Sequence, residues 1–221
     1  MWWVPVVLVG GYVVKKILED DYTDNTPSKD NRTILEQNMS FLSDMIYSEK
    51  GRKIAIIGQP GSGKSTILSK ITNGKCDPLP VIGQRTDATN WHNSFDINFI
   101  SVYQNTKFVD IPGFDTYEHP VSSYIDYFPF SHFDQVIFVL NNKIHDADIR
   151  IFNKIVDTFY SDVSERLYLV RNYADGIDDK DGVKNDLNKL LCFKDKKIKL
   201  CFSSGRTGEG MEEIIKFCRI G

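Results

Sequence analysis

The chain has 221 residues, 26% of them charged, and a formal net charge of −3 at pH 7. This length suits one α/β domain with additional segments, and the slightly acidic balance excludes the basic footprint of a nucleic-acid-binding protein, so we expect no nucleic-acid partner. The 4 cysteines show no CxxC spacing, which argues against a zinc site or a disulfide framework and indicates reduced thiols in a cytoplasmic setting.

Residues 1–18 form an apolar segment, in which the run Trp2–Val14 is followed by Lys15 and Lys16. As a helix this run would extend about 20 Å, which is less than the roughly 30 Å hydrocarbon core of a bilayer. Two interpretations stay open: a short membrane anchor through residues 1–16 with its Trp and Tyr side chains at interfacial depth, or a strand or helix packed on the domain. We favour the anchor.

Residues 19–30 are polar and acidic and contain Pro27, which is typical of a linker. In residues 31–50, apolar side chains recur at helical spacing from Ile34 to Ile46. This pattern predicts an amphipathic helix that precedes the main domain and packs on it.

From residue 51 to 221, apolar strand patterns alternate with helical ones, which predicts one α/β domain. The expected strands cover residues 53–57, 95–102, 107–109, 135–140, 167–170 and 199–202. Helices are expected from near Lys64 to Asn73 and over 149–159, 183–191 and 211–218. The alternation predicts a mainly parallel, six-stranded sheet with helices on both faces and a ligand at the carboxyl ends of its strands.

The first of these strands runs into a glycine-rich turn that fits the phosphate-binding pattern G-x-x-x-x-G-K-S/T without a mismatch. Glycines let successive backbone N–H groups point at phosphate oxygens, and the following helix adds the positive end of its dipole. Lys64 would reach the β- and γ-phosphates, and the Ser65 hydroxyl would bind Mg²⁺. The predicted phosphate-binding residues are Gly58, Gln59, Gly61, Ser62, Gly63, Lys64, Ser65 and Thr66.

Three further motifs follow later strands. Asp110-Ile111-Pro112-Gly113 matches D-x-x-G, in which the aspartate acts on Mg²⁺ and the glycine N–H faces the γ-phosphate. Asn172-Tyr173-Ala174-Asp175 comes after the strand at 167–170, and Ser203–Gly210 comes after the last strand. Each motif alone is weak, but four in this order, each at the carboxyl end of a strand, indicate one nucleotide site.

On these motifs the chain resembles the Ras-like superfamily of GTPases, in its translation-factor class, over roughly residues 50–221. Residues 170–175 are similar to a motif of immunity-related, interferon-inducible-type GTPases. Residues 110–116 resemble a stretch shared by those proteins, AIG-type GTPases and bacterial Era-like GTPases, and residues 204–210 resemble the S-A-K-T-G-E-G of the Era-like group. The resemblance implies the three-layer P-loop NTPase fold of a G domain.

The resemblance also implies roles for residues that read the base. The Asp175 carboxylate would accept the N1 and N2 hydrogens of guanine, Asn172 would support the base edge, and the Ser204–Gly205 backbone would meet the guanine O6. A switch threonine is expected between residues 75 and 94, with Thr86 as our first choice for a Mg²⁺ ligand and Thr89 as the alternative.

Three departures from the family pattern bear on activity. Tyr173 replaces the lysine whose stem covers the base, Phe114 replaces a water-orienting glutamine, and Gly61 stands where potassium-activated Era-like enzymes often carry asparagine. We therefore expect slow hydrolysis, in which Lys64 stabilises the transition-state charge. The missing water-orienting group would come from Gln59, from a switch residue or from a dimer partner.

These observations predict a GTP- and GDP-binding protein with slow Mg²⁺-dependent GTPase activity. It would act as a switch or self-assembling regulator, with a homodimer through its nucleotide face and membrane association through residues 1–16 as further expectations. Two alternatives stay open: a nucleotide-gated binding module with little turnover, and an ATP-binding P-loop protein.

Overall fold

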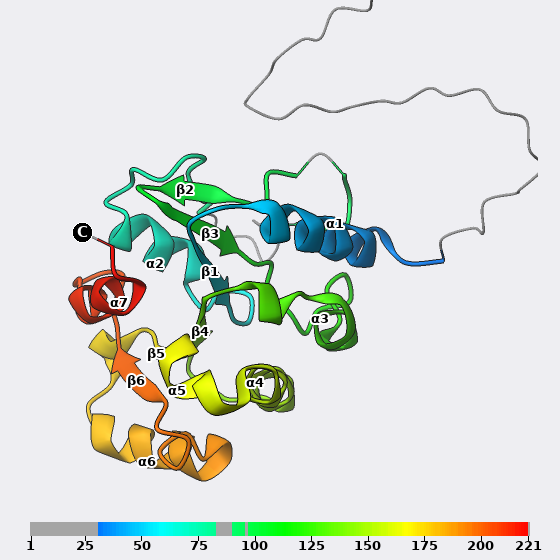
Figure 1. Cartoon of the computed structure of the whole chain (residues 1–221). Helices are drawn as coiled ribbons and strands as arrows, with labels where there is room; N and C mark the ends of the chain where they lie inside the picture. The colour runs from blue at the N-terminus through cyan, green and yellow to red at the C-terminus, as the bar shows by residue number, and fades with distance from the viewer. Residues whose placement is uncertain (1–30, 83–89, 96, 221) are drawn as a thin grey trace, which may run out of the picture. The chain divides into compact units, whose positions relative to one another are not determined.

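A six-stranded sheet in the order β2-β3-β1-β4-β5-β6 forms the centre of the domain (Figure 1). The computed structural model describes residues 31–82, 90–95 and 97–220, and the chain from Arg32 onward forms one unit. β2 pairs antiparallel with β3, and every other neighbouring pair is parallel. The strands are β1 (Arg52–Ile57), β2 (Ser101–Tyr103), β3 (Thr106–Asp110), β4 (Gln135–Leu140), β5 (Leu167–Arg171) and β6 (Lys199–Phe202).

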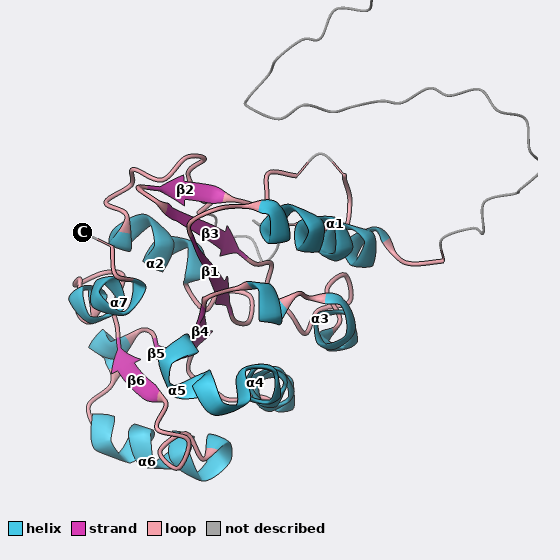
Figure 2. Ribbon diagram, viewed as in Figure 1, coloured by secondary structure: helices cyan, strands magenta, loops and turns pink. Residues whose placement is uncertain are grey.

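Helices cover both faces of this sheet, as predicted (Figures 1 and 2). One face packs against α2 (Lys64–Ile71) and α7 (Met211–Cys218). The other face carries α1 (Ile34–Ser48), α3 (Val121–Tyr127), α4 (Asp146–Phe159), α5 (Val163–Arg166) and α6 (Lys180–Leu191). The described part of the chain also contains three short 3₁₀ helices: η1 (Phe130–His132), η2 (Tyr160–Asp162) and η3 (Ala174–Gly176).

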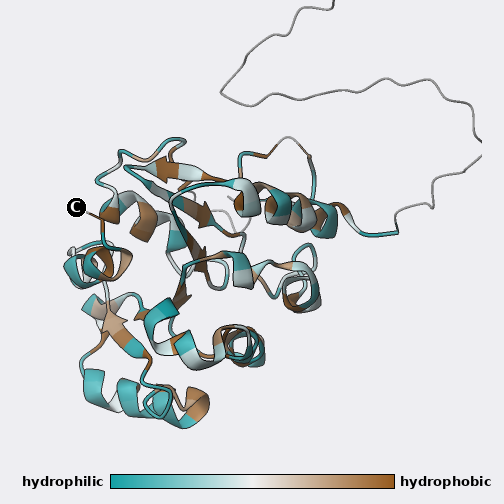
Figure 3. Cartoon of the chain, in the orientation of Figure 1, coloured by the Kyte–Doolittle hydropathy of each residue, from teal (hydrophilic) through white to brown (hydrophobic). Residues whose placement is uncertain are grey.

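The side chains of β1 show how the two apolar layers are separated. Ile54 and Ile56 belong to the core shared with α2 and α7, whereas Ala55 and Ile57 belong to the core on the opposite face. Successive residues of a strand point to opposite faces, so an uninterrupted apolar run fills both layers. Figure 3 shows the result, with hydrophobic strands at the centre and hydrophilic stretches on the outer helices. The predicted three-layer α/β fold is therefore confirmed.

The strand predicted over residues 95–102 is mostly wrong, because β2 begins only at Ser101. Phe99 and Ile100 are both buried, which is incompatible with alternation across a half-buried sheet. Phe99 packs edge-on against Trp91 with ring centroids 4.9 Å apart, and the Ile100 N–H donates to Asn98 Oδ1. Tertiary packing of this segment therefore replaces strand pairing before Ser101.

The outer edge of β2 is occupied by a segment that precedes it in the chain. The backbone N–H and C=O of Val102 pair with those of Asp77 at 2.8 and 2.9 Å. Val102 therefore forms hydrogen bonds with Asp77 on the side of β2 that faces away from β3, while β2 pairs with β3 on its other side.

The predicted amphipathic helix within residues 31–50 is α1, which begins with a capping box between Thr33 and Glu36. Its apolar face, including Met39 and Leu42, is buried in the core beside α3. Asn38, on the same face, donates to the carbonyl oxygens of Trp91 and Ser94 at 2.7 and 2.8 Å. α1 is thus fixed both to the core and to the loop that follows residues 83–89.

The predicted apolar segment and linker, residues 1–18 and 19–30, lie outside the described residues. Within residues 31–82, 90–95 and 97–220, every helix is too short or too polar to cross a lipid bilayer.

Candidate nucleotide-binding site

The glycine-rich turn joins β1 to α2, as the motif requires. Gly63 ends this turn with φ +91°, and a Cβ on it would lie 2.2 Å from Asn172 Nδ2. A side chain here would meet both backbone strain and a direct clash, so only glycine fits. The turn therefore approaches the end of β5 closely at the point where α2 begins.

Lys64 is the first residue of α2, and its side chain lies under the loop. Its Nζ donates to the carbonyl oxygens of Gly58 and Gln59 at 3.0 and 2.9 Å. Burial lowers the Lys64 pKa to about 8, although the Asp110 carboxylate acts in the opposite direction. A buried cation beneath a loop of backbone N–H groups is suited to holding phosphate charge.

Ser65 and Asp110 form the oxygen pair predicted to hold a metal ion. The Ser65 hydroxyl donates to Asp110 Oδ2 at 2.5 Å. Asp110 Oδ1 is buried and has no hydrogen-bond partner among the described residues, and burial raises the pKa of this carboxyl. A carboxylate oxygen without a partner beside a hydroxyl fits Mg²⁺, which takes oxygen ligands and commonly binds through one or two carboxylates together with substrate phosphates.

Across the described residues, no three His, Cys, Asp or Glu side chains gather as a metal site of their own. The Ser65–Asp110 pair supplies two oxygen atoms, which fits a metal ion that is also held by a phosphate group.

The D-x-x-G loop lies directly against the phosphate-binding loop. A Cβ on Gly113 would lie 2.3 Å from the backbone nitrogen of Pro60, so the two loops are in contact and leave no room for a side chain. The next residue, Phe114, is fully buried, with its ring 6.0 Å from that of Tyr124 and 6.2 Å from that of Phe138. Phe114 therefore belongs to the core and cannot orient a water molecule at a phosphate.

Gln59, a predicted catalytic residue, directs its side chain towards α4. Its Nε2 donates to Asp148 Oδ2 at 3.0 Å, and the same oxygen accepts the His145 N–H at 2.8 Å. Burial raises the Asp148 pKa to about 6, against the opposing effect of the hydrogen bond from His145. The Gln59 amide is thus held by a buried carboxyl at the start of α4.

Asn172 joins the end of β5 to the phosphate-binding loop. Its Nδ2 donates to the Ser62 carbonyl at 2.8 Å, and its Oδ1 accepts the Ser203 hydroxyl at 3.2 Å. One buried amide therefore connects three of the predicted loops.

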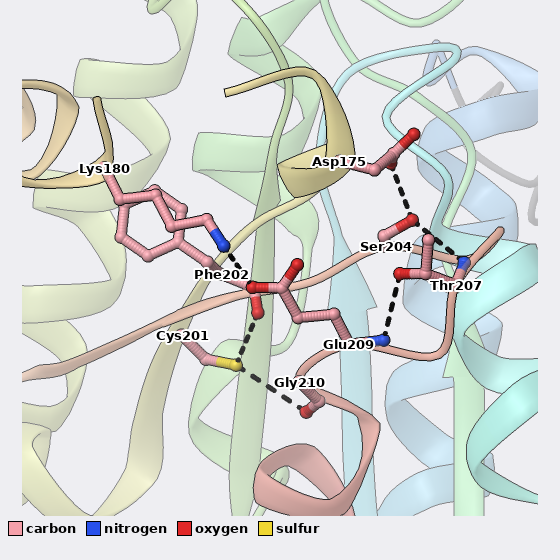
Figure 4. A network of polar contacts seen from close by, with 8 residues as sticks. All are labelled: Asp175, Lys180, Cys201, Phe202, Ser204, Thr207, Glu209 and Gly210. Carbon is pink, nitrogen blue, oxygen red and sulfur yellow. Dashed lines mark hydrogen bonds and ion pairs between the residues drawn. The ribbon is translucent and has the colours of Figure 1, made fainter. Parts of the chain in front are cut away.

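Asp175 and Ser204 face each other at the ends of the neighbouring strands β5 and β6 (Figure 4). Ser204 Oγ donates to Asp175 Oδ1 at 2.6 Å and accepts the N–H groups of Arg206 and Thr207 at 3.2 Å. The Arg206 guanidinium pairs with Asp175 Oδ2 at 2.5 Å. The hydrogen bond from Ser204, together with Arg206, lowers the pKa of Asp175, so its carboxylate is ionised at neutral pH.

Further polar contacts hold the loop after β6, and Figure 4 shows them together. Glu209 pairs with Lys180 of α6, and the Glu209 N–H donates to the Thr207 hydroxyl at 3.3 Å. At Gly205, a Cβ would lie 2.8 Å from Thr66 Cγ2 on α2. The last loop therefore reaches the first turn of the helix that follows the phosphate-binding loop.

The structure thus brings the predicted residues of all four motifs to one edge of the sheet. Thr86 and Thr89, the predicted switch threonines, lie outside the described residues. Two contributors were not predicted from the sequence: Asp148, which holds Gln59, and Arg206, which pairs with Asp175. Arg206 lies within the Ser203–Gly210 motif, but no pattern in the sequence indicates its ion pair.

Taken together, the fold and the loops at the carboxyl edge of the sheet define a P-loop nucleotide-binding domain of the G-domain type. The family described as 50S ribosome-binding GTPase matches residues 53–172, more than half of the chain. The chain therefore belongs to this GTPase family.

Curated relatives include GTPase Der from Coxiella burnetii, which is 26% identical over 199 residues, covering 85% of this chain and 42% of the relative. The chain thus spans less than half the length of this relative. Among solved structures, a dimerization-deficient mutant of Toc33 from Arabidopsis thaliana has a TM-score of 0.55 at 12% identity, covering 83% of this chain and 88% of that one. Era from Aquifex aeolicus bound to GDP and aluminium fluoride has a TM-score of 0.51 at 18% identity, covering 74% of this chain and 54% of that one.

Proposed function

We propose that this GTPase domain binds GTP with Mg²⁺ and hydrolyses it slowly, working as a switch or self-assembling regulator. The observation that carries the proposal is the Asn172 side chain, which bonds the Ser62 carbonyl of the phosphate-binding loop and the Ser203 hydroxyl of the last loop. Residues suited to phosphate and residues suited to guanine therefore share one site.

In the proposed reaction, water attacks the γ-phosphorus and the bond to the β–γ bridging oxygen breaks, which yields GDP and inorganic phosphate. Lys64 and the loop N–H groups would stabilise the charge on the phosphate oxygens. Ser65, Asp110 and Thr86 would hold Mg²⁺, which supplies further neutralisation of phosphate charge. The Gly113 N–H would face the γ-phosphate, as the D-x-x-G motif implies.

Guanine recognition is assigned to the ionised Asp175. Its carboxylate accepts two hydrogens from the edge of guanine, whereas adenine presents an acceptor at N1. The Ser204–Gly205 backbone would meet the guanine O6. Ser204 and Arg206 orient the carboxylate, which supports this assignment.

A calorimetric titration of GTP, GDP and ATP in the presence of Mg²⁺ tests the proposal. We expect GTP and GDP to bind at least about 100-fold more tightly than ATP, because two hydrogen bonds to a charged group distinguish the bases. Asp175→Asn should weaken GTP binding about 10- to 100-fold and improve binding of xanthosine triphosphate, whose O2 accepts from an amide. Asp178→Asn, a change at an exposed position of the same segment, is the control. Equal binding of ATP would contradict the guanine assignment.

A second candidate is a nucleotide-gated binding module with little turnover. Two observations favour it: the Phe114 ring is buried in the core, and the Gln59 amide is held by Asp148. With Phe114 and Gln59 engaged in this way, hydrolysis would require a water-orienting group from a switch residue or from a partner. Single-turnover hydrolysis of GTP separates the two candidates, since only the GTPase converts bound GTP to GDP within the assay.

The homodimer through the nucleotide face can be tested in the same assay. A fold shared with Toc33, whose dimerization-deficient mutant has been solved, supports the idea of pairing. If a second copy supplies the missing group, the single-turnover rate constant should rise with protein concentration. A rate constant that stays flat across a 100-fold concentration range would contradict catalysis by a dimer.

We further propose that the protein is cytoplasmic and associates with a membrane through residues 1–16. The support is the sequence itself, in which an apolar run with two tryptophans ends at Lys15 and Lys16.

A further inference from the structure

A second cavity lies at the amino ends of the strands, at the edge of the sheet opposite to the nucleotide site. β1, β4 and β5 are parallel, so their amino ends lie together, whereas the loops of the nucleotide site follow their carboxyl ends. The cavity has a volume of about 380 Å³ and contains no residue of the four motifs. Its lining includes Arg52 at the start of β1, Gln135 at the start of β4, Arg166 directly before β5 and Arg219 directly after α7.

Gln135 is a buried side chain in this lining, and one end of its amide is unsatisfied. The residue is 7% exposed, and its Nε2 donates to the Phe217 carbonyl at 2.8 Å. Its Oε1 is buried and has no hydrogen-bond partner among the residues that the structure describes. A buried acceptor without a partner is costly and uncommon in folded proteins. Gln135 Oε1 is therefore suited to a ligand that donates an O–H or N–H group.

Two carboxylates also line the cavity, but neither pairs with an arginine. Asp134 Oδ2 accepts the Lys53 N–H at 2.8 Å, so this carboxylate already serves the start of β1. Glu165 is exposed, and no ion pair joins it to another residue in the described part of the chain. Three guanidinium groups without a carboxylate partner make the lining positive, which favours an anionic ligand.

The guanidinium groups keep hydrogen-bond donors that the fold does not use. Arg52 donates through Nη1 to the Cys218 carbonyl at 2.9 Å, and Arg166 donates through Nε and Nη2 to carbonyl oxygens within residues 131–134. For Arg219, the described residues supply no side-chain hydrogen-bond partner. Each guanidinium has five N–H donors in a fork that matches phosphate or carboxylate. Donors therefore remain on all three arginines.

Two of these arginines are held in place by the fold itself. The Arg166 guanidinium carbon lies 4.0 Å from the centre of the Phe159 ring, and Arg52 is bonded to the carbonyl of the last residue of α7. A side chain that is already immobilised loses less conformational entropy when a ligand binds. The cavity thus presents prearranged cationic groups beside an unpaired acceptor.

We propose that this cavity is a binding site for a small organic phosphate that carries a hydroxyl group. The phosphate oxygens accept from the guanidinium groups of Arg52, Arg166 and Arg219, and the hydroxyl donates to Gln135 Oε1. A phosphate suits three guanidinium groups better than a carboxylate does, because it brings three free oxygens and a charge near about −2. Small-molecule sites commonly have volumes of about 300–1,000 Å³, so the cavity is large enough for an organic ligand.

Calorimetric titration of the purified full-length protein with ribose 5-phosphate tests the proposal, with and without saturating GDP and Mg²⁺. We expect a Kd below about 1 mM that GDP does not change, because the cavity and the nucleotide site lie at opposite edges of the sheet. Ribose lacks the phosphate, and inorganic phosphate lacks the sugar hydroxyls. Each should bind at least about 10-fold more weakly than ribose 5-phosphate.

Two substitutions place the binding in the cavity. Arg219→Gln removes an exposed guanidinium and should weaken ribose 5-phosphate about 10-fold. Gln135→Leu removes the unpaired acceptor and should weaken ribose 5-phosphate but not inorganic phosphate. It also removes the bond to Phe217, so Arg219→Gln decides the matter if Gln135→Leu does not fold. Arg150→Gln, at an exposed position of α4 outside the cavity, is the matched control.

Several results would overturn the proposal. These are no binding of ribose 5-phosphate at about 10 mM, equal binding by the wild type and Arg219→Gln, or equal binding of inorganic phosphate, which would indicate an unspecific cationic surface. Binding that disappears when GDP is present would assign the probe to the phosphate-binding loop and would also overturn it. Failure of the protein to bind GTP would instead overturn the proposed function and leave this site untouched.

Discussion

Asp148 is a buried carboxyl that bonds the side chain of a phosphate-loop residue. Its Oδ2 accepts from Gln59 Nε2 and from the His145 backbone, and its pKa is raised to about 6. The ordinary value is 3.8, so between about pH 4 and 6 the folded protein binds more protons at this site than the unfolded chain. Asp148 therefore contributes stability at low pH that is lost as the pH rises through 6.

Asp148→Asn should remove this pH dependence, because the amide oxygen can still accept both hydrogen bonds. We expect the unfolding free energy of the variant relative to the wild type to increase by up to about 3 kcal/mol between pH 4 and pH 7. Denaturant titrations across that range provide the measurement. Parallel pH profiles for the two proteins would show that Asp148 titrates normally, and Asp157→Asn at an exposed position of α4 is the control.

Asn38 is the residue through which α1 holds a distant loop. It is buried, and its amide donates to the carbonyl oxygens of Trp91 and Ser94. Asn38→Ala removes a donor shared by two carbonyl groups, and we expect it to lower the unfolding free energy by about 1–3 kcal/mol.

Gln37→Ala on the same helix is the matched control, because it removes only an exposed hydrogen bond to the Arg32 carbonyl and should change stability by less than about 0.5 kcal/mol. Chemical denaturation of both variants is the measurement. Hydrogen exchange should also show faster exchange around Trp91 in Asn38→Ala alone. Equal stability of the two variants would mean that water satisfies these carbonyls as well as Asn38 does.

Elements with strong local signals were predictable from the sequence. α7 begins at Met211 and ends at Cys218, as the helical spacing indicated, and the fully buried β4 matches its apolar run. β2 was mispredicted because Phe99 and Ile100 are buried by Trp91 and α1 rather than by strand pairing. α3 was not predicted, since its seven residues carry neither a side-chain cap nor a clear apolar period.

The site was predictable to a similar extent and for a similar reason. Asn172 and Asp175 could be singled out from the sequence because their motif follows a predicted strand, and their expected roles came from the family resemblance. Asp148 and Arg206 act through contacts across the fold, and no short-range pattern records those contacts. The bond from Tyr173 to Gly61 likewise joins loops far apart in the chain, and no local pattern indicates it.

At the scale of the whole molecule, residues 1–16 are expected to decide where the protein resides. We expect the full-length protein to float with lipid vesicles in a density gradient and a chain that begins at residue 17 to remain at the bottom. In this proposal the apolar run would supply the binding energy, since each buried apolar side chain favours the bilayer over water. Equal flotation of the two proteins would exclude residues 1–16 as the anchor, and both should bind GDP equally as a test of folding.

The antiparallel edge of the sheet bears on how copies of this chain would associate. β2 is three residues long, and Val102 already shares its outward backbone groups with Asp77. An edge that is short and already occupied offers almost no ladder to a strand from another chain. β6, at the opposite edge, has only four residues. Within residues 31–82, 90–95 and 97–220, neither edge of the sheet therefore offers a long ladder to a strand of a second copy.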